Sequence, residues 1–123
     1  MVRVLICDDS LGFPALVTAW LDDDDRFEHV GTAKTGTELL DLATTTPADA
    51  VVLDLVLPDV ENPAALVSQL RQLLPGVRIL LVSSLAVAEL ERAAEAAGVD
   101  GWAHKAITAR DLTDRLYEVA SDG

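Results

Sequence analysis

The sequence predicts an α/β domain in which a parallel sheet carries helices on both faces. Apolar runs too short for helices occur at Val2–Cys7, Val51–Asp54 and Ile79–Val82. They are rich in Val, Ile and Leu without regular alternation, as expected for strands covered on both sides. Segments of helical periodicity separate them, and strict alternation of this kind implies right-handed crossovers. With 123 residues, half of them hydrophobic, the chain fits one domain.

The first half of the chain after Val2–Cys7 is predicted to form helix, strand and helix. The apolar residues of the first helix recur at three- and four-residue spacing and should therefore share one buried face. They are Phe13, Leu16, Val17, Trp20 and Leu21. An acidic run, Asp22–Asp25, ends it, and Phe27–Ala33 follows as the second strand. Thr35-Gly36-Thr37-Glu38 has the capping-box form, so a second helix begins there.

The second half repeats this alternation from Val51–Asp54 onward. Asn62-Pro63 has the pattern of a cap and first helical residue, since proline there gives up only an amide without an intrahelical partner. A fourth helix is predicted over Val87–Ala97, with Gly98 just past its end. Gly101–His104 should form a short fifth strand, and Thr108 caps the last helix.

Composition excludes several classes of function. The 21 acidic and 9 basic residues give a net charge of −12, which disfavours direct nucleic-acid binding and favours cationic ligands. The apolar runs are far shorter than the roughly 20 residues of a membrane span, and we see no secretion signal. Because Cys7 is the only cysteine, an internal disulfide and a multi-cysteine metal site are excluded. We therefore expect a cytoplasmic location without membrane contact.

Polar residues that could bind a ligand or take part in a reaction follow the predicted strands. Ligands of such sheets bind beyond the carboxyl ends of the strands, where the sequence places Asp8-Asp9, Asp54, Ser83 and Lys105. Three carboxylates brought together repel one another unless a cation joins them, and hard oxygen ligands suit Mg²⁺. An ammonium and a hydroxyl can hold further phosphate oxygens. The pattern therefore makes a carboxylate a plausible phosphoryl acceptor.

These residues, in this order, resemble the motif of the receiver domains of bacterial two-component response regulators. The resemblance covers nearly the whole chain and is closest to receivers joined to LuxR/NarL-type helix-turn-helix output domains. It implies a flavodoxin-like, doubly wound fold with five parallel strands in the order 2-1-3-4-5 and five helices. It also implies that residues 1–123 form a single receiver domain, either stand-alone or excised from a longer regulator.

The resemblance implies a phosphorelay role, in which Asp54 accepts a phosphoryl group from a histidine kinase. Asp8, Asp9, Asp54 and the backbone carbonyl of Val56 would hold Mg²⁺. Lys105 and Ser83 would stabilise the added charge, and Ser83 with Trp102 would switch a partner-binding face. The partners implied are the kinase and an output domain, output protein or second copy of the chain. The domain would catalyse only its own phosphorylation and dephosphorylation, and would not otherwise be an enzyme.

Several alternatives stay open at the level of sequence. Asp8-Asp9 could cap the first helix, and Trp102 could serve only in packing. A degenerate receiver would act as an interaction module without phosphorylation, and a flavin binder could share the fold. A haloacid-dehalogenase-type phosphatase would need an acid two residues after its nucleophile, where this chain has Val56.

Two departures from the family carry expectations of their own. Val56 and Leu85 are apolar at positions that influence dephosphorylation, which predicts a long-lived phosphoryl state. The bond between Lys105 and Ala106 should be trans, because a cis bond before a non-proline residue costs about 2.5 to 4 kcal/mol.

Overall fold

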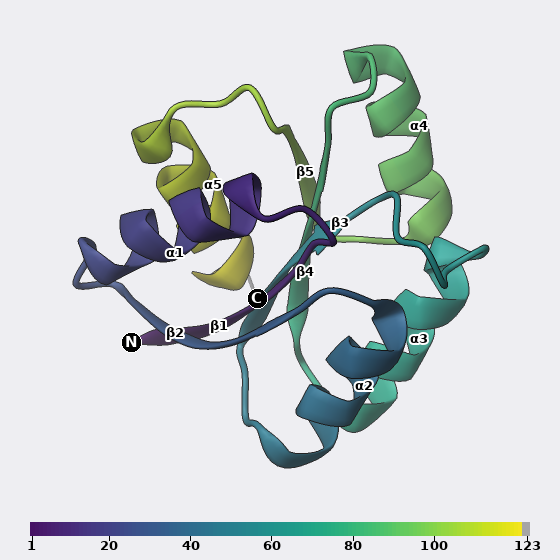
Figure 1. Cartoon of the computed structure of the whole chain (residues 1–123), viewed down its shortest axis with the longest axis horizontal. Helices are drawn as coiled ribbons and strands as arrows, with labels where there is room; N and C mark the ends of the chain where they lie inside the picture. Colours follow the sequence, from purple (N-terminus) through teal and green to yellow (C-terminus); the bar gives the residue numbers. More distant parts are fainter. Residues whose placement is uncertain (122–123) are drawn as a thin grey trace.

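A computed structural model of the protein describes residues 1–121 and confirms the predicted alternation of strands and helices (Figure 1). The elements are β1 Val2–Cys7, α1 Gly12–Asp22, β2 Phe27–Ala33, α2 Gly36–Thr45, β3 Ala50–Asp54, α3 Pro63–Leu73, β4 Arg78–Ser83, α4 Val87–Ala97, β5 Gly101–His104 and α5 Ala109–Ser121. The predicted domain extends to Gly123, so its last two residues lie outside the described part.

The five strands form one parallel sheet in the order β2-β1-β3-β4-β5, as predicted. Helices α1 and α5 cover one face, and α2, α3 and α4 cover the other (Figure 1). Successive strand residues point to opposite faces, so Val4 and Ile6 pack with α1 and α5 while Leu5 and Cys7 pack on the other side. This double coverage explains why the strands show no polar alternation.

Side-chain caps begin the second and third helices where the sequence predicted them. The Thr35 hydroxyl accepts a hydrogen bond from the Glu38 amide (3.1 Å). Glu38 reaches back one residue further than in a standard capping box, since its carboxylate accepts from the Lys34 amide (3.3 Å). Asn62 likewise accepts from the Ala64 amide (3.1 Å). Both helices therefore start at positions set by local sequence.

The ends of α4 and α5 also agree with the sequence. Gly98 follows α4 in the left-handed conformation (φ 73°), which a residue without a Cβ adopts at little cost. The Thr108 hydroxyl accepts from the Asp111 amide (3.2 Å) at the start of α5. Within residues 1–121, no helix combines the length and apolar character that a bilayer crossing needs.

The predicted face of α1 was wrong at one position. Pro14, Val17 and Leu21 are the buried residues of this helix, whereas Leu16 is 52% exposed. Leu16 lies one residue before Val17 and hence roughly 100° around the helix from it, at the margin of the stripe that faces the sheet.

Candidate functional site

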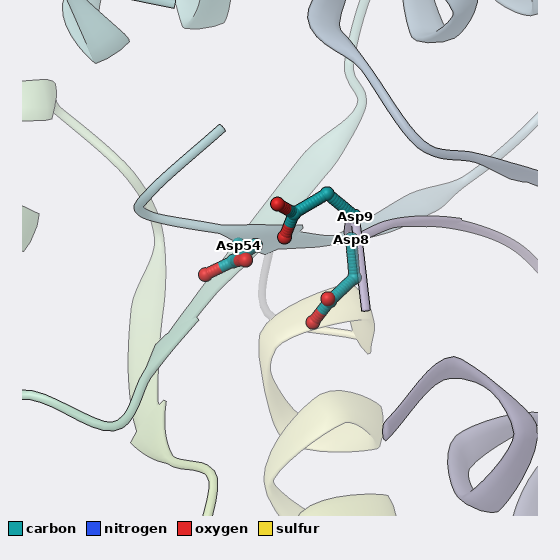
Figure 2. A group of neighbouring side chains, drawn as sticks. All are labelled: Asp8, Asp9 and Asp54. Carbon is teal, nitrogen blue, oxygen red and sulfur yellow. The ribbon is translucent and has the colours of Figure 1, made fainter. Parts of the chain in front are cut away.

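The carboxyl edge of the sheet brings together the three predicted carboxylates (Figure 2). Asp54 is the last residue of β3, and Asp8 and Asp9 follow β1, which pairs directly with β3. One oxygen from each carboxylate lies within 4.8 Å of the others. Asp8 and Asp54 are only 1% and 6% exposed, and Asp9 is open to solvent. The site is therefore a partly buried acidic cluster with one accessible side.

Lys105 joins this cluster from the segment after β5. Its ammonium nitrogen lies 2.7 Å from Asp8 Oδ2 and 3.4 Å from Asp54 Oδ2. The Lys105 amide donates to the Ser83 carbonyl (2.9 Å), which holds the segment against the end of β4. The ammonium also lies 5.2 Å from the centre of the Phe13 ring, within range of a cation–π contact. The Lys105–Ala106 bond is trans, as predicted.

Burial and charge oppose each other at this edge. Burial raises the pKa of Asp54, and the neighbouring Asp8 raises it further, while Lys105 offsets part of the shift. For Lys105, burial lowers the pKa, but the hydrogen bond to Asp8 and the charges of Asp54 and Asp8 outweigh it, so the net shift is upward. The one ammonium lies against Asp8 and Asp54 in a cluster of three carboxylates, so the cluster carries more negative than positive charge.

The donor set fits a divalent cation. Asp8 Oδ1 accepts from the amide and hydroxyl of Ser10 (2.8 and 2.7 Å). Its buried Oδ2 faces the Lys105 ammonium and accepts no other hydrogen bond from the described residues. Clustered carboxylate oxygens with unused lone pairs are the ligands that Mg²⁺ prefers. Asp8, Asp9 and Asp54 could therefore hold this ion.

The simpler role of Asp8 and Asp9 as helix caps was wrong. Helix α1 begins at Gly12, and the residue before it, Leu11, provides no side-chain cap. The Asp8 side chain instead closes a turn through Ser10, within the loop that leads to the helix. Both carboxylates thus stay at the end of β1.

Val56 and Ser83 lie at the same edge of the sheet as the cluster, whereas Trp102 lies within β5, two residues before its end. The Val56 amide donates to Asp54 Oδ1 (3.3 Å), while the metal-binding role of its carbonyl stays a prediction. Ser83 is buried at the end of β4, and its hydroxyl accepts from the Leu85 amide (3.1 Å). Trp102 is half-buried in β5 and packs against the core beside α4, so packing and switching are both compatible with its position.

His104 has partners that the sequence did not indicate. Its Nδ1 accepts from the Ala106 amide (3.0 Å), which assigns the proton to Nε2, 3.2 Å from the Ser84 carbonyl. The imidazole therefore links the loop after β4 to the segment that carries Lys105. A sequence signal for this contact is lacking, because it depends on two loops meeting. The sequence likewise did not indicate Asp59, whose carboxylate accepts from the Gly36 and Thr37 amides at the start of α2.

Known proteins are similar to this chain in sequence and fold. The family model for the response regulator receiver domain matches residues 4–117. A protein-glutamate methylesterase/protein-glutamine glutaminase from Myxococcus xanthus is 36% identical over 85 residues, or 69% of this chain and 23% of that protein. Response regulator protein VraR from Staphylococcus aureus is 28% identical over 97% of this chain and 56% of its own length.

A solved structure agrees with these sequence relatives. The signal receiver domain of the response regulator NarL from Mycobacterium tuberculosis superposes with a TM-score of 0.84 at 26% identity, covering 99% of this chain and 98% of that one. The chain thus spans about a quarter of the methylesterase and about half of VraR. With the motif, the strand order and these matches in agreement, the chain belongs to the receiver domain family of two-component response regulators.

Proposed function

We propose that this chain takes a phosphoryl group from a phosphohistidine of a histidine kinase onto Asp54. The observation that carries the proposal is the Lys105 ammonium, held 3.4 Å from Asp54 and 2.7 Å from Asp8 beside a cluster that fits Mg²⁺. A carboxylate that is buried, next to a fixed cation and beside the solvent-exposed Asp9 suits an incoming anionic group.

In the proposed transfer, an Asp54 carboxylate oxygen forms a bond to phosphorus as the N–P bond of the donor breaks, and the leaving imidazole nitrogen takes up a proton. Lys105 moves from carboxylate to phosphoryl oxygens, and Ser83 donates its hydroxyl to another. A bound Mg²⁺, held by Asp8, Asp9, Asp54 and the Val56 carbonyl, would supply further neutralising charge.

The proposed output is a changed binding face. When the Ser83 hydroxyl turns toward the phosphoryl group, it leaves the Leu85 amide, and the loop before α4 shifts. Trp102, which packs beside α4, changes rotamer in response. Residues 1–123 act as one cytoplasmic receiver domain that binds a kinase and an output domain, output protein or second copy. The domain catalyses no reaction beyond its own phosphorylation and dephosphorylation, and does not bind nucleic acid directly.

Intact-mass measurement after incubation with acetyl phosphate and Mg²⁺ tests the proposal. We expect one phosphoryl adduct on the wild type, none with EDTA in place of Mg²⁺, and none on Asp54→Asn. Asp41→Asn, which removes an exposed carboxylate on α2, is the matched control and should label like the wild type. Labelling of Asp54→Asn would contradict the assignment of Asp54. A wild type without adduct would favour an interaction module that works without phosphorylation.

A further inference from the structure

Asp59, in the loop between β3 and α3, binds the first turn of α2 from more than twenty residues away. Its Oδ1 accepts from the Gly36 amide (2.8 Å). Its Oδ2 accepts from both the amide and the hydroxyl of Thr37 (3.0 and 2.8 Å). One side chain thus makes three short hydrogen bonds to a helix that it does not belong to.

These bonds complete the cap of α2. The first amides of a helix lack intrahelical partners, and Thr35 satisfies only the Glu38 amide in this turn. Asp59 accepts from the two amides that precede it, so the loop provides what the local sequence does not. The positive end of the helix also favours a carboxylate. The hydrogen bonds from Gly36 and Thr37 accordingly hold the pKa of Asp59 below its usual range.

Close packing accompanies the polar contact. A Cβ added at Gly36 would lie 2.6 Å from Val60 Cγ2, and valine has little rotamer freedom with which to yield. The Val60 amide donates to the Leu57 carbonyl (3.3 Å), which closes a turn around Asp59, and Leu57 is buried in the core. The loop is therefore held at Leu57 and at Asp59, within five residues of Asp54.

We propose that Asp59 is a positioning residue for the metal site, which it orders through the backbone between Asp54 and Asp59. This backbone includes the Val56 amide, which donates to Asp54 Oδ1, and the Val56 carbonyl, which is the proposed Mg²⁺ ligand. The inference rests on the proposed function, because the ion concerned is the Mg²⁺ of that site. Loss of an outer contact that orders metal ligands typically weakens affinity about 10- to 100-fold; the lower end applies here because Asp8, Asp9 and Asp54 stay in place.

Calorimetric titration of the full chain with MgCl₂, paired with thermal unfolding in EDTA, tests this role. We expect Asp59→Ala to weaken Mg²⁺ binding about tenfold, and Asp59→Asn, which retains one acceptor, to fall between it and the wild type. Gly36→Ala should weaken binding independently, by pressing on Val60. Thr35→Ala is the matched control, because it removes a cap from the same helix turn but leaves the loop contacts intact.

The control separates positioning from general stability. Thr35→Ala should lower the melting temperature in EDTA while its Mg²⁺ affinity stays within twofold of the wild type. Equal Mg²⁺ affinity of Asp59→Ala and the wild type, or an equal loss in Thr35→Ala, would overturn the positioning role. If the wild type itself bound no Mg²⁺, the proposed function would fail as well, so the two failures are distinguishable.

Discussion

Replacing Asp54 by Asn should stabilise the protein in metal-free buffer, although the same change should abolish the proposed phosphorylation. The two side chains have nearly the same shape, and the Asn oxygen can still accept from the Val56 amide. What the change removes is a negative charge on a group that is only 6% exposed and lies beside Asp8. Lys105 stays paired with Asp8 at 2.7 Å, so its ammonium is not left alone.

The magnitude follows from three opposing contributions. One carboxylate oxygen of Asp8 and one of Asp54 lie within 4.8 Å of each other, so their repulsion is at least about 3.5 kcal/mol for an effective dielectric constant of 20. Attraction of Asp54 to Lys105 at 3.4 Å is about 5 kcal/mol on the same basis. These nearly offset each other, so the burial cost of the carboxylate, several kcal/mol in proteins, decides the sign. We expect a gain of about 1 to 3 kcal/mol in the free energy of unfolding.

The gain should depend on pH in a defined direction. Because the pKa of Asp54 is raised above 3.8 in the folded protein, ionisation of this group penalises the folded state. Below pH 3.8 the carboxyl is protonated in both states, and the penalty is absent. It grows as the pH rises toward the folded-state pKa and is complete above it. The difference in stability between Asp54→Asn and the wild type should therefore increase as the pH rises above 3.8, and should become constant above the pKa of Asp54 in the folded protein.

Thermal unfolding in EDTA, repeated with Mg²⁺, measures this difference. For a domain of this size the gain corresponds to a rise of roughly 3 to 12 °C in Tm for Asp54→Asn. Mg²⁺ should raise the Tm of the wild type more than that of the variant. A bound ion stabilises the folded state in proportion to its affinity for that state, and the variant lacks one of the three carboxylates of the site. Asp9→Asn, at an exposed position, should shift the metal-free Tm less. A lower metal-free Tm for Asp54→Asn than for the wild type would refute the reasoning.

Three further predictions concern the rest of the chain. Asp100→Ala should lower the free energy of unfolding, measured in urea, by about 1 to 3 kcal/mol, because the Asp100 carboxylate accepts from the Ile79 amide (2.8 Å) and binds Arg71 (3.2 Å). An unchanged free energy of unfolding would mean that water replaces the carboxylate. Burial raises the pKa of Cys7 to about 12, so iodoacetamide at pH 8 should label it only in urea. Phosphorylated protein should keep its adduct well beyond seconds in Mg²⁺ buffer, because the apolar side chain of Val56, which is 62% exposed, cannot orient an attacking water. Val56→Asn should therefore shorten the lifetime of the adduct. Decay of the wild-type adduct within seconds would contradict this prediction.

The order of elements and the chemistry of the site were predictable from local patterns. Apolar runs without alternation identified the strands, and short capping motifs at Thr35 and Asn62 located two helix starts, because both signals act between residues close in sequence. The site residues could be found because parallel strands end at one edge, so Asp54 and Lys105 had to approach each other. The strand order itself came from the resemblance to a family.

Tertiary structure alone decided how the loops meet. Asp59 binds the start of α2, and His104 links the loop after β4 to the segment after β5, yet neither contact has a periodic or capping signal at its own position. The raised pKa of Asp54 likewise depends on burial and on the distance to Asp8, which sequence spacing does not contain. Local sequence thus determined which groups reach the edge of the sheet, whereas packing between distant segments determined their distances, their partners and the direction of their pKa shifts.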